Sequence, residues 1–444
     1  MNIDKIADFA VSMRDRDIPT DILQLGRMCI VDWFGVALGA HNDETAIAVR
    51  RAAKLLWPNS GSSMVLLGDP APSAAAALIN GTMAHCLDYD DTHIASVVHF
   101  SSATLASALA VGTEIGASPE RILRAFICGF EVGARLGSSD FGSSLNHRGW
   151  HSTGVLACLA ATVAACSIYD LDEDHIKRAL GAAATQIGGL TASFGTMSKP
   201  FHAGKAALNA VISTQLARSG FMPKLDLLEP DGGLAAALIQ DGSVSIPSVQ
   251  FGSDWELAKN TFKPYASCLL THPVIDAARE LANAGDNREI ASIVAYVNPM
   301  TPKLAGKTKV QTPLEAKFST AFCVAMALRG RPLTFDNFVP DNIADQEIMV
   351  LADKVTMTVV EQMPKIASRL VISYTNGDNA QAEIKFALGN PENPMSFDEV
   401  REKFLGLTVP VIGGNANALF DQLSAFGNED FNKIYSLASL KIAA

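Results

Sequence analysis

The sequence is poor in charged residues, which make up 18% of its 444 residues, whereas apolar residues make up 48%. This balance excludes a disordered chain and allows a large buried core, and the length allows two or three domains. The formal net charge is -11, and no run rich in Lys or Arg occurs. The sequence therefore excludes a nucleic-acid partner, although a local cluster of cations can still bind an anionic substrate.

The sequence also lacks the CxxC spacing of metal and redox motifs, because its cysteines are scattered through apolar segments (29, 86, 128, 158, 166, 268 and 323). Reduced, buried thiols are typical of cytoplasmic proteins. The stretch MNIDKIADFAVSMRDRDIP is charged and has no apolar core of a secretory signal. The run GVLACLAATVAAC is too short for a membrane span. We expect a cytoplasmic protein with no membrane partner.

Strand signals are scarce up to about residue 262, where apolar residues recur at steps of three and four, as in DILQLGRMCIVDWFGVALGA. The pattern changes from 266 to 399 and becomes helical again from SFDEVREKFLG onward. The predicted fold is mainly α. A large all-helical domain, discontinuous in sequence (1–265 and 400–444), carries an inserted, smaller α+β lid domain (266–399).

Within the lid, EIASIVAYVN (289–298) and KVTMTVV (354–360) alternate and are rich in β-branched residues. RLVISYTNGDNAQAEIKFAL (369–388) predicts two strands around an Asn-Gly turn. PLEAKFSTAFCVAMALRG (313–330) and DQEIMVLADKV (345–355) predict helices between these strands.

The segment MAHCLDYDDTHIASVVHF (83–100) places His85, Asp88, Asp90, Asp91 and Thr92 among apolar residues. On a helix, His85, Asp88 and Thr92 would share one face at positions i, i+3 and i+7. A magnesium site on this aspartate-rich helix would need a second acidic cluster, which the sequence lacks. Capping of a helix end is another interpretation. We favour an active-site role without a metal, because buried acids and histidines need partners or a task.

The segment NHRGWHSTG (146–154) places His151, Ser152 and Thr153 at the predicted start of an Ala-rich helix. A helix N-terminus lowers the affinity of a histidine for a proton, which suits a neutral base beside a carboxylate. The alternative is a Ser/Thr cap with incidental histidines. No GxSxG motif of a hydrolase is present.

In SFGTMSKPFHAGKAALNAV (193–211), Lys199-Pro200 is predicted to end one element, and His202, Gly204 and Lys205 to open a helix. Two lysines and a histidine at a helix start favour carboxylate binding or proton transfer. The alternative is surface lysines at a turn. Neither GxGxxG nor a P-loop occurs, so nucleotide binding is not indicated.

In FKPYASCLLTHPVIDAA (262–278), Lys263, Tyr265, Thr271 and His272 lie at the predicted junction of the two domains, where ligand sites are common. The alternative is a hinge with a core histidine. These four segments hold seven of the nine histidines (85, 93, 99, 147, 151, 202 and 272). Such clustering favours acid/base chemistry.

Five strings, in this order, resemble the MmgE/PrpD family: AHCLDYDDTH followed by His99, RGWHSTGVL, SKPFHAGKAA, KPYASCLLTHPVIDAA and EAKFSTAFCVA. The family includes 2-methylcitrate dehydratase, cis-aconitate decarboxylase and iminodisuccinate epimerase. The resemblance implies a homodimer without a cofactor, whose site lies between the helical domain and the lid and takes a small anionic carboxylate substrate.

Transferred residue by residue, the resemblance implies that the site binds carboxylates and moves protons next to them through Asp88, Thr92, His99, His151, Lys199 and His272. His151 and Lys199 are the candidate bases, with His99 and His272 as a second proton carrier or carboxylate binder. Further candidates for binding the substrate are His202, Lys205, Lys263 and Tyr265.

The sequence departs from the family at two positions. Phe100 follows His99 where proline is usual, and Phe322 stands where decarboxylase-like members carry a tyrosine. Since phenylalanine cannot donate a proton, Phe322 argues against decarboxylation unless another acid serves.

The implied chemistry is removal of a proton from a carbon next to a carboxylate. The sequence supplies histidines and lysines for two faces of that carbon and lacks the tyrosine. We therefore place an epimerase of an imino- or amino-dicarboxylate, such as iminodisuccinate, first. The alternative is a hydro-lyase that acts on a tricarboxylate like 2-methylcitrate. An alternative from another class is an inactive carboxylate-binding module.

Overall fold

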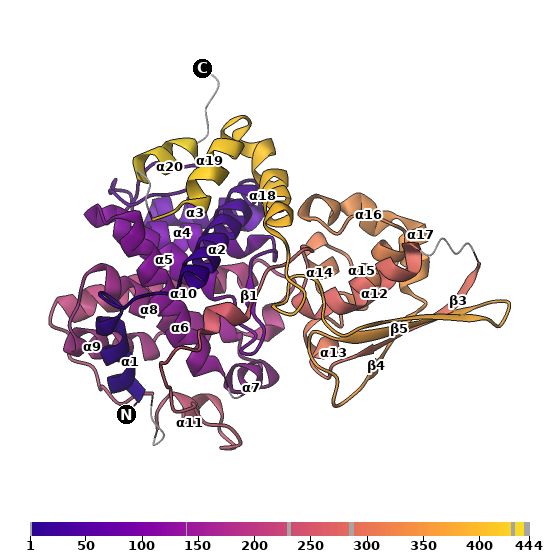
Figure 1. Cartoon of the computed structure of the whole chain (residues 1–444), viewed down its shortest axis with the longest axis horizontal. Coiled ribbons are helices and arrows are strands. Elements are labelled where there is room, and N and C mark those ends of the chain that lie inside the picture. Colours follow the sequence, from indigo (N-terminus) through magenta and orange to yellow (C-terminus); the bar gives the residue numbers. More distant parts are fainter. Residues whose placement is uncertain (1, 139, 229–231, 284–287, 428–430, 439–444) are drawn as a thin grey trace.

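The computed structural model describes residues 2–138, 140–228, 232–283, 288–427 and 431–438. Figure 1 shows two parts side by side, a body of packed helices and a smaller part with a sheet. The fold is mainly α, with a smaller α+β part, as predicted. Residues 439–444 of the predicted second helical segment, and residues 284–287 of the lid, lie outside the described residues.

The helical body is built from thirteen helices of the first and last parts of the chain. They are α1 (Asn2–Ser12), α2 (Thr20–Gly39), α3 (Glu44–Leu56), α4 (Ser73–Cys86), α5 (Phe100–Ile115), α6 (Pro119–Gly137), α7 (Phe141–His147), α8 (Ser152–Ile168), α9 (Glu173–Ala184), α10 (Ser198–Arg218), α18 (Phe397–Ile412), α19 (Asn415–Ser424) and α20 (Phe431–Leu437). The short helix α11 (Leu234–Leu238) lies in the connection toward the lid.

Helices α4, α8 and α10 form the centre of the body, because α10 packs against both α4 and α8. The contact between α4 and α10 depends on glycine. A Cβ atom on Gly204 would lie 2.1 Å from Oγ1 of Thr82 and 2.4 Å from the carbonyl oxygen of Leu78. Since real Cβ atoms never approach so closely, only glycine allows the backbones to meet. This contact brings the C-terminal end of α4 beside the N-terminal end of α10.

The lid contains a four-stranded sheet of β3 (Ile290–Val297), β4 (Val355–Val359), β5 (Ser368–Tyr374) and β6 (Asn379–Ile384). The strand order is β4-β3-β5-β6, with β3 parallel to β4 and antiparallel to β5. The predicted hairpin is present, since β5 pairs with β6 and Gly377 of the Asn-Gly turn has φ +90°. The predicted strands at 289–298 and 354–360 are confirmed by β3 and β4.

The helices of the lid are α12 (His272–Asn283), α13 (Thr301–Leu304), α14 (Pro313–Ala316), α15 (Thr320–Leu328), α16 (Pro340–Ala344) and α17 (Gln346–Ala352). Helix α12 packs on β5 and β6, and α15 packs on α12 and β4. The single helix predicted over 313–330 is wrong, because Ser319 caps α15 by accepting a hydrogen bond from the backbone nitrogen of Phe322. The break leaves Lys317 and Phe318 between α14 and α15.

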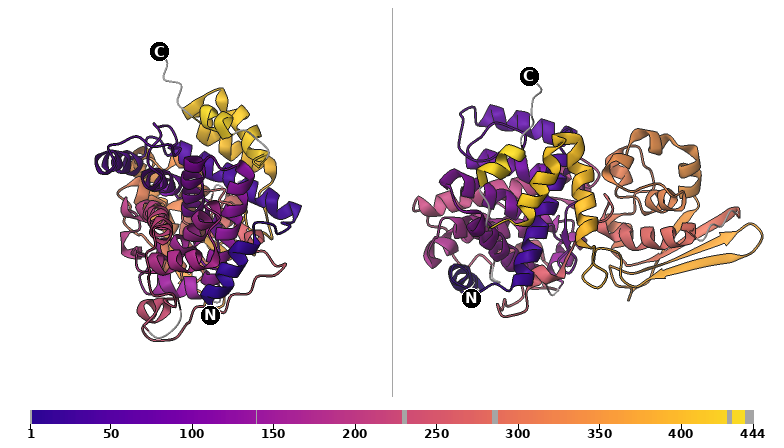
Figure 2. Two further views of the ribbon diagram at one scale, coloured as in Figure 1. Left: turned by 90° about the vertical axis from the view of Figure 1, so that its left-hand side faces the viewer. Right: turned by 45° about the horizontal axis from the view of Figure 1, so that its top comes forward.

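The end of the chain returns to its beginning. Helix α18 follows the lid and packs along α2, and Figure 2 shows α18 to α20 in yellow against the first helices. At this contact Nζ of Lys403 lies 2.5 Å from Oδ1 of Asp32 and donates to the carbonyl oxygen of Tyr89 at 2.7 Å. The last helices therefore support the segment that follows α4.

In the described part of the chain, only α2 is long and apolar enough to cross a membrane, and 67% of its most apolar window is buried. Core helices of globular proteins meet the same criteria, so this helix is weak evidence for a membrane span.

Candidate active site

The segment after α4 leaves the helix at Cys86, so the prediction that Asp88 and Thr92 lie on one helix with His85 is wrong. Asp88 has φ +52°, in the left-handed region that ends a helix. Thr92 and His93 form a short strand, β1, which pairs with β2 (Asn260–Thr261) in antiparallel register. This ladder brings the aspartate-rich segment beside the residues that enter the lid.

Asp88 lies between two lysines from distant parts of the chain. Its Oδ1 lies 2.5 Å from Nζ of Lys199 and 3.2 Å from Nζ of Lys263. Lys263 also donates to the backbone carbonyl of Asp88 at 2.9 Å. All three side chains are buried, at 3% exposure for Asp88, 4% for Lys199 and 0% for Lys263. Burial alone would raise the pKa of Asp88, but the two lysines outweigh it and hold that pKa well below its ordinary value.

The position of Lys199 corrects the prediction that Lys199-Pro200 ends an element. Helix α10 begins at Ser198, so Lys199 lies in the first turn of the helix that also carries His202 and Lys205. Proline is well tolerated there, because the first turn needs no backbone donor. The same turn holds Nζ of Lys199 5.6 Å from the ring of Phe318, which belongs to the lid.

His99 is the residue before α5, and its Nδ1 faces three acceptors. These are the backbone carbonyl of Asp91 at 3.0 Å, Oγ1 of Thr92 at 3.2 Å and Oδ2 of Asp90 at 3.2 Å. Burial lowers the pKa of His99, and Lys263 and Lys199 add to the effect, while Asp90 opposes it.

His151 precedes the first residue of α8, as predicted for a helix start. Its Nδ1 lies 3.0 Å from Nδ1 of His202, and its ring lies 4.9 Å from the ring of Phe194. Burial holds the pKa of His151 well below its ordinary value, and Lys199 adds to the effect. Burial and Lys199 likewise lower the pKa of His202 to about 4. Both rings are therefore neutral near pH 7.

A small cavity of about 40 Å³ joins these groups. Its polar lining includes six of the predicted residues: Asp88, Thr92, His99, His151, Lys199 and Lys263. The lid contributes Cys268 and an apolar wall of Leu269, Leu270, Leu304 and Phe318. A volume of this size holds a few water molecules.

Four predicted residues do not line this cavity. Lys205 donates to the carbonyl of Gln186 at 3.2 Å, and Tyr265 donates to Oδ1 of Asp276 at 2.5 Å. His272 packs against Tyr265 with ring centres 5.1 Å apart, and burial followed by Lys263 lowers the pKa of His272 to about 3. His202 lies beside His151 and does not line the cavity. Of the predicted residues, the other six line the cavity.

Phe322, where a tyrosine was expected, is fully buried and contacts Phe338 with ring centres 6.3 Å apart. It does not line the cavity, whereas Phe318 does. Sequence reasoning also missed Asp90 and Cys268 as members of the site. Asp90 belongs to the aspartate cluster already noticed, but only the turn after α4 shows which of the three carboxylates meets a histidine.

The three clustered aspartates have separate partners, which argues against a shared magnesium site. Asp88 meets lysines and Asp90 meets histidines, whereas Asp91 accepts hydrogen bonds from Ser101 and Asn260. Magnesium sites instead gather carboxylate oxygens around one point. His85, Asp90 and His99 form the one buried group in the described residues whose ligand atoms lie close enough for a metal, but these atoms already bond to one another. The absence of a metal stays a prediction.

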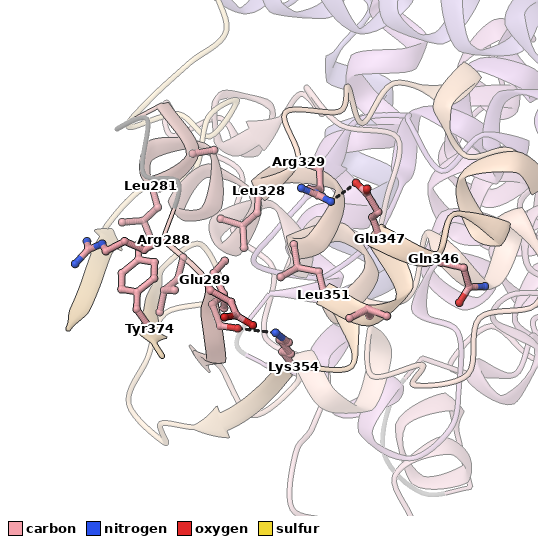
Figure 3. Close-up of a pocket in the computed structure, with 14 residues that line it drawn as sticks. Leu281, Arg288, Glu289, Leu328, Arg329, Gln346, Glu347, Leu351, Lys354 and Tyr374 are labelled. Atoms are coloured by element: carbon pink, nitrogen blue, oxygen red, sulfur yellow. Dashed lines mark hydrogen bonds and ion pairs between the residues drawn. The ribbon is translucent and has the colours of Figure 1, made fainter. Parts of the chain in front are cut away.

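Figure 3 shows a wider pocket of about 710 Å³ on the lid, lined by residues of α12, α15, α17, β3 and β5. Among its lining residues, Arg329 forms an ion pair with Glu347, and Nζ of Lys354 donates a hydrogen bond of 2.6 Å to the carbonyl of Ile290. The guanidinium group of Arg288 lies 3.9 Å from the ring centre of Tyr374. It shares no lining residue with the cavity at Asp88 and holds no comparable set of histidines and lysines.

Comparison with known proteins identifies the family of this chain. The MmgE/PrpD N-terminal domain matches residues 4–247, and the MmgE/PrpD C-terminal domain matches residues 265–424. The cis-aconitate decarboxylase-like protein oryM of Aspergillus oryzae is 26% identical over 438 residues, which cover 92% of this chain and 90% of that protein. The cis-aconitate decarboxylase of Aspergillus terreus is 25% identical over 430 residues, covering 90% and 88%. The cis-aconitate decarboxylase of Homo sapiens is 24% identical over 404 residues, covering 86% and 82%. With both domain types matched in order along the fold, the chain belongs to the MmgE/PrpD family.

Proposed function

We propose that this protein is a hydro-lyase that needs no cofactor and removes water from a small hydroxylated di- or tricarboxylate, such as 2-methylcitrate. The observation that carries the proposal is the pairing of two neutral imidazoles, His99 and His151, with two lysines in one small cavity. A neutral imidazole accepts a proton, and ammonium groups stabilise the enolate that forms next to a carboxylate.

The proposed reaction begins when His99 takes the proton from the carbon beside a carboxylate, and the electron pair of the C–H bond forms an enolate. Lys199 stabilises that charge. The electron pair then forms the alkene as the carbon–oxygen bond breaks, and the ammonium group of Lys263 gives a proton to the departing hydroxyl group. Dehydration is placed ahead of the decarboxylation that the names of the relatives suggest, because it begins with removal of a proton from carbon, and the neutral histidines that burial favours here are suited to accept that proton.

An epimerase of an imino- or amino-dicarboxylate such as iminodisuccinate is the second candidate, and Cys268 is the observation that favours it. Epimerisation needs a second proton carrier facing the histidines across the carbon. Cys268 lines the cavity from the lid, and burial raises the pKa of its thiol to about 11, so it carries a proton. His272, the carrier first expected, lies outside the cavity lining.

Proton NMR in D₂O, with EDTA-treated protein, tests these candidates. The substrates are 2-methylcitrate, cis-aconitate and the stereoisomers of iminodisuccinate. Loss of water from 2-methylcitrate supports the proposal. Interconversion of iminodisuccinate isomers without an alkene, abolished in Cys268→Ala, would establish the epimerase instead. Release of carbon dioxide from cis-aconitate would show a decarboxylase, and binding of all three without turnover would leave the carboxylate-binding module.

The same samples test the remaining expectations about assembly and substrate. We propose a homodimer that binds small carboxylates, as the family resemblance implies. Light scattering of the purified protein should give twice the chain mass of 47.0 kDa. A monomer with full turnover would contradict it.

A further inference from the structure

Asp90 is a buried carboxylate whose ionic partners, among the described residues, are both histidines. Its Oδ2 lies 2.7 Å from Nδ1 of His85 and 3.2 Å from Nδ1 of His99. Its Oδ1 has no hydrogen-bond partner in the part of the chain that the structure describes, and the residue is 1% exposed. Burial alone would raise the pKa of Asp90, but the two histidines outweigh it and hold this pKa well below its ordinary value.

The contacts of His99 determine which of its nitrogens carries the proton. Nδ1 faces the carboxylate of Asp90 and the backbone carbonyl of Asp91, which can only accept hydrogen bonds. Nδ1 therefore carries the hydrogen of the neutral ring. Since His99 lines the cavity, Nε2 is the nitrogen left with a free lone pair for a substrate.

We propose that Asp90 is a positioning residue that fixes the tautomer of His99 and stabilises the imidazolium formed when His99 accepts a proton. The inference rests on the proposed function and deepens it by naming the residue that positions the base. The proton passes from carbon to Nε2, the electron pair of the C–H bond stays on the substrate, and the hydrogen on Nδ1 remains bonded to Asp90. A buried carboxylate beside an imidazolium supplies this stabilisation in catalytic histidine–aspartate pairs.

His85 competes with His99 for the same oxygen of Asp90. Its Nδ1 makes the shorter contact, its ring centre lies 4.5 Å from that of His99, and it does not line the cavity. The contact with His85 therefore orients the carboxylate of Asp90 and weakens its interaction with His99. Removing His85 should strengthen the interaction between Asp90 and His99.

Other charges around His99 act in both directions. The groups whose charges act on His99, or on which its charge acts, are Asp88, Asp90, His85, His151, Lys199 and Lys263. The lysines favour the neutral ring, and the carboxylates favour the imidazolium. Since none of these other residues is altered in an Asp90 variant, a change in the titration of His99 can be assigned to Asp90.

The first test is the pH profile of Asp90→Asn, with Asp91→Asn as the matched control. Burial raises the pKa of Asp91 to about 7, and its carboxyl group contacts Ser101 and Asn260 instead of the ring of His99. In Asp90→Asn, kcat should fall about 100-fold, and the acid limb of kcat/KM should move to lower pH. His85→Leu should move that limb to higher pH. If Asp90 had a purely structural role, the acid limb would stay in place in both variants. An unshifted acid limb in folded Asp90→Asn would overturn the proposal.

The second test needs no substrate. Ring nitrogen NMR of histidine-labelled wild-type protein, with His99 assigned from a His99→Gln sample, should show a neutral ring protonated on Nδ1. A ring protonated on Nε2 would overturn the proposal even if Asp90→Asn fails to fold. If the Nδ1 tautomer is found and no carboxylate is turned over, the proposed function fails while the pairing of Asp90 with His99 stands.

Discussion

Nδ1 of His151 lies 3.0 Å from Nδ1 of His202, a contact that two imidazoles make only when one ring donates and the other accepts. His151 lines the cavity and His202 does not. The tautomers of the two rings are therefore coupled, and the ring that lines the cavity is oriented by the ring behind it.

Replacing His202 with Phe should reduce kcat about tenfold and leave KM nearly unchanged. The reason is the loss of one buried hydrogen bond that orients His151, worth about 1.4 kcal/mol in the barrier. Steady-state kinetics on the substrate identified by NMR measure the effect. Lys205→Met is the control, because Lys205 lies one turn further along α10 and bonds only to the carbonyl of Gln186. Equal losses in both variants would contradict the role given to His202.

Asp88→Asn and Lys199→Met should differ in stability. Asp88→Asn leaves the ammonium groups of Lys199 and Lys263 buried with no carboxylate between them, which costs about 3–5 kcal/mol. Lys199→Met leaves Asp88 paired with Lys263 and should cost about 1 kcal/mol. Urea unfolding at pH 7 measures both free energies.

The stability of the Asp88 cluster should also depend on pH. Because the folded pKa of Asp88 is lowered, its stabilising contribution is complete above the unfolded pKa near 4 and is lost as the pH falls toward the folded value.

Turnover should fall about 100-fold in Lys199→Met, since the enolate loses a cation. An active Lys199→Met protein would remove this lysine from the mechanism.

Lys365→Met should weaken closure of the lid. Nζ of Lys365 reaches from the lid to the body, where it donates to Oγ of Ser143 at 2.6 Å and to the carbonyls of Ile94 and Ala95 at 3.4 Å. Ile94 lines the cavity. Loss of about 1 kcal/mol of this contact should raise KM about fivefold with a smaller change in kcat. Lys385→Met, at an exposed lysine of the lid, should leave KM unchanged, and an unchanged KM in both variants would show that the contact does not help closure.

Local sequence signals predicted most of the fold. Alternation marked β3 and β4, and Asn376-Gly377 marked the hairpin because the turn needs a positive φ. The broken helix at Ser319 was missed, since its apolar pattern runs on across the cap. Helical periodicity likewise extended α4 past Cys86, although Asp88 takes a left-handed conformation that no pattern of apolar residues encodes.

The sequence predicted which residues line the candidate site better than it predicted how those residues are arranged. Residue type and resemblance identified Asp88, His99 and Lys199, all of which line the cavity. They could not separate His151 from His202, because both are histidines at the start of a helix and only packing puts one behind the other. The role of Asp90 depends on a turn that directs neighbouring carboxylates to different partners.

The ion pair between Lys403 and Asp32 makes the order of synthesis important. Asp32 is buried in α2, and its counter-ion lies on α18, beyond the whole lid. A growing chain that has emerged only through β6 carries Asp32 and the carbonyl of Tyr89 without this partner, and an uncompensated buried carboxylate disfavours the native packing. The segment that bears the aspartates therefore gains its full support only when α18 is in place. The first third of the sequence thus depends on the last part of the chain for the partner of a buried carboxylate.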